Sequence, residues 1–333
     1  MIILVSGASG FVGGTITRHL LASGHTVRAM SRSAARARTA LETTPQGRDS
    51  LAEGRLTLVE ADITQPPTLA AAVEGVDAVV QAAQFRGAPV EDPARGFTYM
   101  EVDGHGTANL LGALCRVYGE PTAGPALARF PNGAPRFLYM SGISVSPDSP
   151  HSWDRAKWTA EQAIRGSGLD WTIVRGCWAY GPNDAALNRL IGYSDLLPFV
   201  PVFGPGKEPL TPVYVEDIGR LFGLIVASPE KASDTTFALG GPDEVTLNEF
   251  LRLALAAKGR RRPILHIPMW AGKIQGTLMQ RLPGRPLTPD AVDFVSQGGA
   301  ATDADRRLLA QRFPEFQTTP VEEGLARYMR GEH

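Results

Sequence analysis

The first fourteen residues, MIILVSGASGFVGG, limit what this chain can fold into more than any other stretch. Residues 2–5 form an apolar run rich in β-branched side chains, which is typical of a strand buried on both faces. Gly7, Gly10 and Gly13 follow at the spacing G-x-x-G-x-x-G, and residues 11–21 then have a helical pattern. Such glycines permit a tight turn, the close approach of a pyrophosphate and tight helix packing. The stretch therefore predicts a dinucleotide site at a helix N-terminus.

Composition narrows the class of protein further. The chain has 333 residues, with 33 Lys and Arg, 34 Asp and Glu and a net charge of -1, so a nucleic-acid partner is not expected. The basic run KGRRR at residues 258–262 fits a solvated loop. Cys115 and Cys177 are too few for a disulfide framework. No basic leader precedes the first strand, and no apolar run reaches the roughly 18 residues of a membrane span. We expect a cytoplasmic protein.

The rest of the chain alternates strands and helices. Strand patterns recur at residues 25–30, 56–60, 76–82, 136–140, 171–175 and 236–239, and helical patterns at residues 67–73, 97–118 and 153–164. This alternation predicts an α/β fold with a Rossmann-type, doubly wound parallel sheet. The predicted domains are a nucleotide-binding domain at 1–182 with a returning segment at about 210–240, and a smaller, mostly helical substrate-side lobe at 183–209 and 241–333. The proline- and glycine-rich residues 119–135 predict a surface loop.

The residues after the second strand distinguish the two nicotinamide dinucleotides. Ser31, Arg32 and Ser33 stand where an acidic residue would bind a ribose 2′-hydroxyl and an arginine would accommodate a 2′-phosphate. No acid is present, and the planar guanidinium of Arg32 can pair with a phosphate, with help from Arg28 or Arg36. We therefore predict NADP(H) in preference to NAD(H). The alternative for Arg32 is an ordinary solvent-facing arginine.

Two further strand ends belong to the same edge of the predicted sheet. Ala82, Ala83 and Gln84 end the fourth strand and are expected beside the cofactor ribose, because open α/β sheets bind ligands at the carboxyl ends of their strands. Asp62 follows the third strand, where it can accept a hydrogen bond from an adenine amino group, with Ile63 against the ring. The alternative for Asp62 is a turn or cap before the next helix.

Several stretches together carry a family resemblance. They are GASGFVGG at 7–14, Asp62-Ile63, Ser141, Lys157 with Glu161, DWTIVRGCWAYGP at 170–182, VYVEDIGR at 213–220 and FALGGPDEVTLNEF at 237–250. On these the chain resembles the extended and atypical short-chain dehydrogenase/reductase family, which is NAD-dependent epimerase/dehydratase-like. It is most similar to members resembling the nucleotide-binding accessory subunit of respiratory complex I. The predicted cofactor-binding set is Gly7, Ser9, Gly10, Phe11, Val12, Gly13, Arg32, Asp62, Ile63, Ala82, Ala83, Gln84 and Lys157.

The resemblance implies redox chemistry by a Tyr-x-x-x-Lys pair and a serine or threonine. Residues four apart share a helix face, so the lysine lies near the phenol and its charge favours the phenolate. Lys157 matches this lysine, but Trp153 stands at the tyrosine position, and an indole N–H donates a hydrogen bond without titrating. The family serine falls on Ser141 or on Gly142, which has no hydroxyl. The predicted catalytic set is thus Lys157 and Ser141, with Trp153 unable to transfer a proton.

Three routes remain for a chain without the family tyrosine. Tyr139, Tyr180 or His151 supplies the acid; or Lys157 itself serves as acid or base, as in relatives that reduce activated double bonds. Otherwise the protein binds the cofactor without turnover, as the complex I subunit does. The two classes of function are therefore an NADP(H)-dependent oxidoreductase, or an epimerase or dehydratase relative, and a cofactor-binding protein whose nucleotide stabilises or regulates an assembly.

Aromatic residues around the sixth strand indicate an apolar substrate pocket. Trp153 and Trp178 favour a flat or hydrophobic substrate, here a small carbonyl compound; the alternative is that they fill the core. Cys177 is interpreted as a small buried hydrophobe rather than a catalytic thiol. The expected partners are this small-molecule substrate and a protein partner or a second copy of the chain. No metal site is predicted.

The C-terminal part carries further helix signals. Asp217 is expected to cap or orient the helix that it opens, and Thr246 with Glu249 predicts a capping box. Residues 268–282 have amphipathic helical spacing, and we expect this helix to pack on the protein rather than on a membrane. An exposed apolar face on it would mark a partner site.

Overall fold

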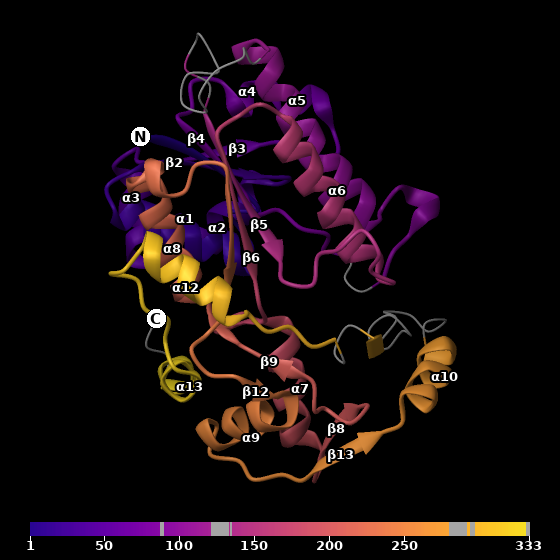
Figure 1. The fold of residues 1–333 in the computed structure, drawn as a ribbon. Coiled ribbons are helices and arrows are strands. Elements are labelled where there is room, and N and C mark those ends of the chain that lie inside the picture. Colours follow the sequence, from indigo (N-terminus) through magenta and orange to yellow (C-terminus); the bar gives the residue numbers. More distant parts are fainter. Residues whose placement is uncertain (87–89, 121–132, 134, 280–291, 294–296, 331–333) are drawn as a thin grey trace.

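A seven-stranded parallel sheet forms the centre of the computed structural model (Figure 1). Its strands in chain order are β1 (Ile2–Ser6), β2 (Thr26–Ser31), β3 (Leu56–Glu60), β4 (Ala78–Gln81), β5 (Arg136–Gly142), β6 (Trp171–Gly176) and β11 (Thr235–Leu239). The spatial order β11-β6-β5-β4-β1-β2-β3 reverses between β1 and β4, and all neighbours are parallel. The predicted doubly wound sheet is confirmed. The structure describes residues 1–86, 90–120, 133, 135–279, 292–293 and 297–330.

Helices cover both faces of this sheet (Figure 1). One face carries α1 (Phe11–Ala22), α2 (Ala34–Leu41), α3 (Pro45–Ala52), α8 (Val215–Ala227) and α12 (Asp303–Arg312), whose apolar side chains share one core with the strands. The other face carries α4 (Ala70–Val73), α5 (Gly106–Tyr118) and α6 (Ser152–Gly166), which form a second core. The sheet is therefore buried on both sides, as its continuous apolar runs predicted.

Most predicted elements are present, with differences at their ends. The helix expected at 97–118 begins as a π-helical turn, Met100–His105, before α5, and the helix expected at 67–73 begins as a 3-10 turn, Pro66–Thr68, before α4. Further 3-10 turns lie at Pro93–Arg95 and Pro229–Lys231. Of the loop predicted at 119–135, residues 121–132 and 134 lie outside the described residues.

A third core lies below the sheet in Figure 1. Its helices are α7 (Ala185–Leu196), α9 (Leu247–Ala257) and α13 (Val321–Arg330). Three strand pairs border it: β7 (Ala179–Tyr180) with β10 (Val213–Tyr214), β8 (Val200–Phe203) with β13 (Ile264–Ile267), and β9 (Pro209–Leu210) with β12 (Val245–Thr246). The predicted capping box of Thr246 and Glu249 opens α9. The division of the chain into two domains stays a prediction.

Asp217 holds the C-terminal segment rather than capping α8. Tyr214 occupies the N-cap position of this helix. The buried carboxylate of Asp217 accepts hydrogen bonds from the backbone N–H and the hydroxyl of Thr319, at 2.6 and 2.8 Å. A nearby ring pair, Phe237 of β11 and Phe313 after α12, has centroids 5.8 Å apart. These contacts fasten the last part of the chain to the nucleotide-binding sheet.

Helix α10 (Met269–Met279) lies within the segment 268–282 that was predicted to be helical, and residues 280–282 lie outside the described residues. Its Gly272 and Gly276 are buried, whereas Trp270, Ile274 and Leu278 are exposed on the opposite side. Among the residues that the structure describes, no helix has both the length and the apolar character needed to cross a bilayer.

Candidate functional site

The glycine turn after β1 lies at the point where the strand order reverses, which is where open α/β sheets bind ligands. Gly7 has a φ of +68°, and its carbonyl accepts a hydrogen bond from the N–H of Gly10 at 2.8 Å. A Cβ atom on Gly7 would lie 2.7 Å from Cα of Ala83, and one on Gly13 would lie 2.3 Å from the Gly7 carbonyl oxygen. A side chain is thus excluded at Gly7 and at Gly13. No side chain caps α1, whose first N–H groups are available to an anion.

A cavity of about 740 Å³ opens beside this turn. Every predicted cofactor residue except Lys157 lines it. Its walls come from the ends of β1, β2, β3 and β4, and therefore from segments far apart in the sequence. The volume, the glycine turn and the helix N-terminus fit a dinucleotide whose pyrophosphate lies against the backbone of residues 7–13.

Three predicted arginines differ in their surroundings. Arg32 is exposed, lines the cavity and forms no ion pair within the part of the chain that the structure describes. Arg28 points elsewhere, because its guanidinium donates to the carbonyls of Ala72 and Glu74 at 2.8 and 2.7 Å. Arg36 lies on α2 and is not among the described residues lining the cavity. Only Arg32 of the three is therefore placed at the candidate cofactor site.

Asp62 forms the turn considered for it and also lines the larger cavity, whereas its contact with an adenine stays a prediction. Its Oδ1 accepts hydrogen bonds from the N–H and the hydroxyl of Thr64 at 2.9 and 2.8 Å, which forms a local turn. The same residue lines the cavity together with Ile63. The turn orients the carboxylate without removing it from the candidate site.

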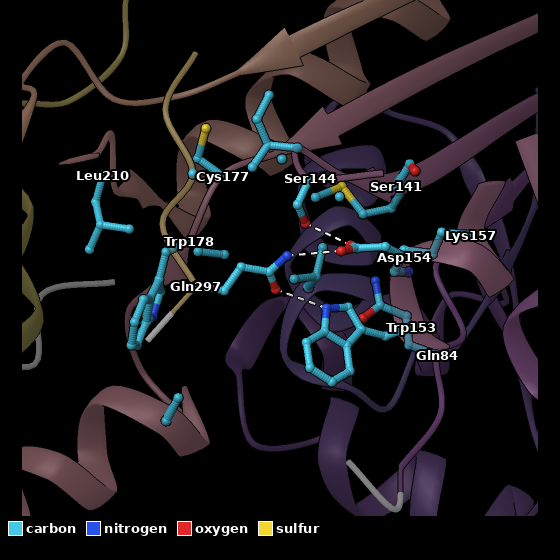
Figure 2. A pocket seen from close by; sticks show the side chains of 18 of the residues that line it. Gln84, Ser141, Ser144, Trp153, Asp154, Lys157, Cys177, Trp178, Leu210 and Gln297 are labelled. Carbon is cyan, nitrogen blue, oxygen red and sulfur yellow. Dashed lines mark hydrogen bonds between the residues drawn. The ribbon is translucent and has the colours of Figure 1, made fainter. Parts of the chain in front are cut away.

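A second cavity, of about 350 Å³, adjoins the first (Figure 2). Phe11, Val12 and Gln84 line both. The second cavity is bounded by the ends of β5 and β6, by α6, and by residues 297–299 of the C-terminal region. Its position makes it the candidate substrate site beside the nicotinamide end of a dinucleotide.

Lys157 supplies a buried cation to the second cavity. Residues Trp153 and Lys157 stand four apart on α6, and both line this cavity, as their shared helix face predicts. The Lys157 ammonium has no hydrogen-bond partner among the described residues and lies 5.7 Å from the ring centroid of Tyr139. Burial raises the pKa of the Asp103 carboxyl, and the positive charge of Lys157 lowers this pKa by a smaller amount. A buried cation without an acceptor is costly, so its position fits the binding of a ligand oxygen.

Trp153 takes part in a hydrogen-bonded row across the cavity (Figure 2). Its Nε1–H donates to Oε1 of Gln297 at 2.9 Å, and Nε2 of Gln297 donates to Oδ2 of Asp154 at 2.8 Å. Asp154 also accepts from the hydroxyls of Ser144 and Ser149, at 2.6 and 2.7 Å. Trp153 thus acts as a donor only, as expected for an indole.

Ser141 lines the cavity, but its hydroxyl is directed to the protein interior. It donates to Oε1 of Glu161 at 2.7 Å. Glu161 is fully buried and also binds the guanidinium groups of Arg175 and Arg165. The neighbouring Gly142 has no hydroxyl. Neither of the two positions that can match the family serine therefore offers a hydroxyl to a ligand.

The three other residues considered as proton donors do not face the candidate substrate site. Of the residues that the structure describes, Tyr139, Tyr180 and His151 line neither cavity. Burial, then the charges of Asp103 and Glu161, raises the pKa of Tyr139 well above its usual value. Tyr180 is fully buried and donates to the Val321 carbonyl. His151 stacks on Trp153, with ring centroids 4.3 Å apart.

Cys177 and Trp178 form the opposite wall of the second cavity. Burial raises the pKa of Cys177 to about 11, so this residue is a neutral thiol at pH 7. It accepts a hydrogen bond from the Thr211 hydroxyl at 3.1 Å. Asp184 lies beside Trp178, and burial raises the pKa of this carboxyl to about 6. The interpretation of Cys177 as a small buried side chain agrees with this environment.

Four polar residues of the cavity are absent from the predicted set: Ser144, Asp154, Asp184 and Gln297. Asp154 had a usable signal, because it adjoins Trp153 near the start of the same predicted helix. Asp184 caps α7 through the N–H groups of Ala186 and Leu187, as an aspartate before a helical run allows. Gln297 gives no local signal, since it reaches the cavity from more than 140 positions along the chain.

Comparison with known proteins decides the family. A family model described as NAD(P)H-binding matches residues 7–184, which is more than half of the chain. The chain belongs to this NAD(P)H-binding family. The match begins at the glycine turn and ends at Asp184, so it covers all the described residues lining the larger cavity except Ala185, and most of those lining the smaller one.

Relatives agree with the predicted resemblance. The chain is 29% identical over 127 residues to subunit 9 of the mitochondrial NADH dehydrogenase (ubiquinone) 1 alpha subcomplex of Arabidopsis thaliana, covering 38% of this chain and only 32% of that protein. It is 28% identical to a 3 beta-hydroxysteroid dehydrogenase/Delta 5→4-isomerase of Mycobacterium tuberculosis, covering 84% and 75%. It is 23% identical to the photosystem II assembly factor Ycf39 of Synechocystis, covering 98% and 90%. The predicted resemblance to the complex I subunit, within an NAD(P)H-binding family, is confirmed.

Solved structures support the same fold. A UDP-glucose 4-epimerase of Thermotoga maritima, crystallised with UDP-glucose, superposes with a TM-score of 0.68 at 18% identity, covering 99% of this chain and 98% of that one. A dTDP-glucose 4,6-dehydratase of Bacillus anthracis in complex with NAD gives a TM-score of 0.69 at 13% identity, covering 99% and 96%. At these identities the similarity concerns the fold alone.

Proposed function

We propose that this NAD(P)H-binding protein prefers NADP(H) and is an oxidoreductase acting on a small apolar carbonyl compound. The observation that carries the proposal is Lys157, a residue that lines the cavity next to the one around the glycine turn and whose buried ammonium has no hydrogen-bond partner among the described residues. Because Gly7 and Gly13 have no side chains, the backbone of the turn can approach a pyrophosphate closely. The buried ammonium of Lys157 is suited to bind the ribose hydroxyls of the same cofactor.

The preference for NADP(H) rests on Arg32. Its guanidinium is exposed on the wall of the larger cavity, directly after β2, where the 2′-position of an adenosine ribose is expected. Neither Ser31 nor Ser33 supplies the carboxylate that would favour a 2′-hydroxyl. A planar guanidinium binds a phosphate through paired hydrogen bonds, which is the reason for expecting a large difference between the two dinucleotides.

The walls of the smaller cavity support an apolar, uncharged substrate. Met140, Ile143, Trp178 and Leu210 contribute hydrocarbon or aromatic surface. Among its described lining residues there is no arginine, and the acids Asp154 and Asp184 outnumber the one cation. A nucleoside diphosphate sugar, such as the UDP-glucose of the solved epimerase, needs cationic partners for its phosphates. The hydroxysteroid dehydrogenase among the relatives is named for an apolar substrate, in agreement with this choice.

Reduction of a carbonyl requires a hydride at carbon and a proton at oxygen. The nicotinamide supplies the hydride when bound. The indole N–H of Trp153 does not titrate, so Trp153 cannot supply this proton. In the proposed mechanism Lys157 Nζ gives that proton as the C=O bond becomes a C–OH bond, and then takes a proton from solvent. Positioned acid catalysis of this kind is worth roughly a hundred- to ten-thousand-fold in rate.

A second candidate function is cofactor binding without turnover, in an assembly with a protein partner or a second copy of the chain. Three observations favour it. Trp153 stands four residues before Lys157, where the family has a tyrosine, and the Ser141 hydroxyl is bound to Glu161. Relatives include a subunit of a respiratory complex and an assembly factor. For either function we propose the cytoplasm, on the basis of the two free cysteines.

Titration with NADPH and with NADH, followed by a hydride-transfer screen, tests these alternatives. We expect NADPH to bind more tightly and at least one ketone, aldehyde or enone to oxidise it. Binding of neither dinucleotide would reject both candidate functions. Tight NADPH binding without turnover across the panel would favour the non-catalytic function.

A further inference from the structure

The side-chain amide of Gln297 makes two contacts at once in the smaller cavity. Its oxygen accepts from the indole of Trp153 and its nitrogen donates to the carboxylate of Asp154, at 2.9 and 2.8 Å. The two protein groups are neighbours on α6, and Figure 2 shows the amide lying against both of them. A donor and an acceptor are therefore presented side by side to a single planar group.

Both members of this pair are held by contacts that do not involve Gln297. The Asp154 carboxylate accepts from Ser144 and Ser149, and the residue is 1% exposed. The Trp153 ring stacks on His151 with an interplanar angle of 7° and lies 5.9 Å from the ring of Tyr99. Groups fixed in this way form a preorganised binding site, because little conformational freedom is lost when a ligand binds.

We propose that Trp153 and Asp154 form a recognition site for the carboxamide or lactam edge of the substrate, which binds in place of the Gln297 amide. The inference rests on the proposed function, since it takes the cavity beside Lys157 as the substrate cavity. It adds the chemical class of the group that is recognised. The reducible carbonyl is a separate part of the same substrate.

Hydrogen-bond chemistry separates the ligand classes. A carboxamide offers an oxygen to the indole N–H and an N–H to the carboxylate, as Gln297 does. A ketone offers the oxygen alone and leaves Asp154 without that donor. A carboxylate places a negative oxygen against Asp154, which like-charge repulsion opposes. The expected order of affinity is carboxamide, then ketone, then carboxylate.

Gln297 is a built-in competitor for this site. A ligand amide must displace it, so shortening the side chain should strengthen the binding of an amide. Removing the two hydrogen bonds with which Gln297 competes should raise the affinity for an amide about tenfold. If Gln297 had only a structural role, shortening its side chain would lower the affinity for an amide or leave it unchanged.

The test is calorimetric titration of the NADPH-saturated protein with benzamide, acetophenone and benzoate, which share one ring and differ in the polar group. We expect benzamide to bind at least fivefold more tightly than acetophenone, and benzoate to bind most weakly. Equal affinities for benzamide and acetophenone would overturn the inference. NADPH binding is measured in the same samples, so a failure of the cofactor proposal is recorded separately.

Three variants sharpen the test. Gln297→Ala should raise the affinity for benzamide about tenfold. Gln311 lies at an exposed position on α12, so Gln311→Ala is the matched control and should not change this affinity. Trp153→Phe keeps a ring against His151 and removes the N–H, so benzamide affinity should fall about fivefold. Unchanged benzamide affinity in both Gln297→Ala and Trp153→Phe would refute the proposed site.

Discussion

The hydroxyl of Ser141 donates a hydrogen bond to the carboxylate of Glu161, and this contact joins the end of β5 to α6 in a region closed to solvent. Arg175 of β6 binds the same carboxylate at 2.9 and 2.7 Å. The serine that the family pattern marks as catalytic therefore helps to satisfy a buried charge, and its effect on the protein should be structural.

Ser141→Ala should lower the free energy of unfolding by about 1–3 kcal/mol, because Glu161 loses a donor that water cannot replace. Affinity for NADPH should change less than twofold. Urea unfolding and nucleotide titration of the same samples measure both quantities. Ser146→Ala, at a half-buried position in the following turn, is the control. A large loss of NADPH affinity with unchanged stability would show that the hydroxyl serves the ligand instead.

Arg32→Ala should weaken NADPH binding about 10- to 100-fold and leave NADH binding nearly unchanged, because the lost guanidinium pairs with a group that only NADPH carries. Fluorescence titration with each dinucleotide provides the measurement. Arg36→Ala removes an equal charge from a position that does not line the cavity and should have little effect. Equal losses for both dinucleotides in Arg32→Ala would reject the cofactor choice.

Trp153→Tyr should create or raise carbonyl reductase activity, since it places a titrating phenol four residues before Lys157. A gain of about a hundredfold or more in the rate of NADPH oxidation is the expected size of such acid catalysis. Trp153→Phe has a ring but no phenol and should show no gain. A folded Trp153→Tyr variant without added activity would mean that more than the missing phenol limits the chemistry.

Gly13→Ala should destabilise the protein by about 1–3 kcal/mol and weaken both dinucleotides, because the new methyl would lie 2.3 Å from the carbonyl oxygen of Gly7. Thermal unfolding with and without NADPH tests this expectation. Gly112→Ala is the matched control within α5, where the nearest atom is the flexible end of Arg116 at 3.6 Å. If both variants behaved alike, the close approach at the glycine turn would not be the cause.

Asp184 should make stability dependent on pH. Burial raises the pKa of its carboxyl from 3.8 to about 6, so the folded protein binds this proton more tightly than the unfolded chain does. The stability that this group contributes is therefore present below about pH 4 and is lost as the pH rises through about 6, by at most about 3 kcal/mol. Asp184→Asn keeps a capping oxygen for α7 and removes the titration.

The measurement compares urea unfolding of the wild-type protein and Asp184→Asn at pH 4, 5, 6 and 7. Other groups titrate in both proteins, so the difference between the two is the relevant quantity. The wild-type protein should lose stability relative to the variant as the pH rises across this range. A constant difference would show that Asp184 does not titrate there.

Local patterns predicted the parts of this protein that local chemistry determines. The glycine turn, the strand before it and the helix after it are placed correctly, because spacing, backbone freedom and side-chain branching all favour one arrangement at Gly7. The alternation of strands and helices likewise predicted the sheet. The π-helical turn at Met100–His105 was not predicted, since apolar spacing alone does not distinguish it from an α-helix.

The candidate substrate site depends on contacts between distant segments, and here prediction was incomplete. The family resemblance matched Lys157 and Trp153 to a pair that shares one helix face, and both residues line the same cavity. The residue that completes the hydrogen-bonded row, Gln297, comes from a segment with no motif. Ser141 was predicted to be catalytic from its match to the family serine. Its hydrogen bond to Glu161 could not be predicted, because the fold brings these two residues together.

The stretch that follows α10 returns to the sheet, where Phe313 packs against Phe237 and Thr319 binds Asp217. A single cut between β6 and β11 would consequently remove from the sheet both the strand at its edge and the helix α12 that packs on it. Expressing the sheet and its helices without the third core would need a spliced or circularly rearranged gene rather than a shorter one.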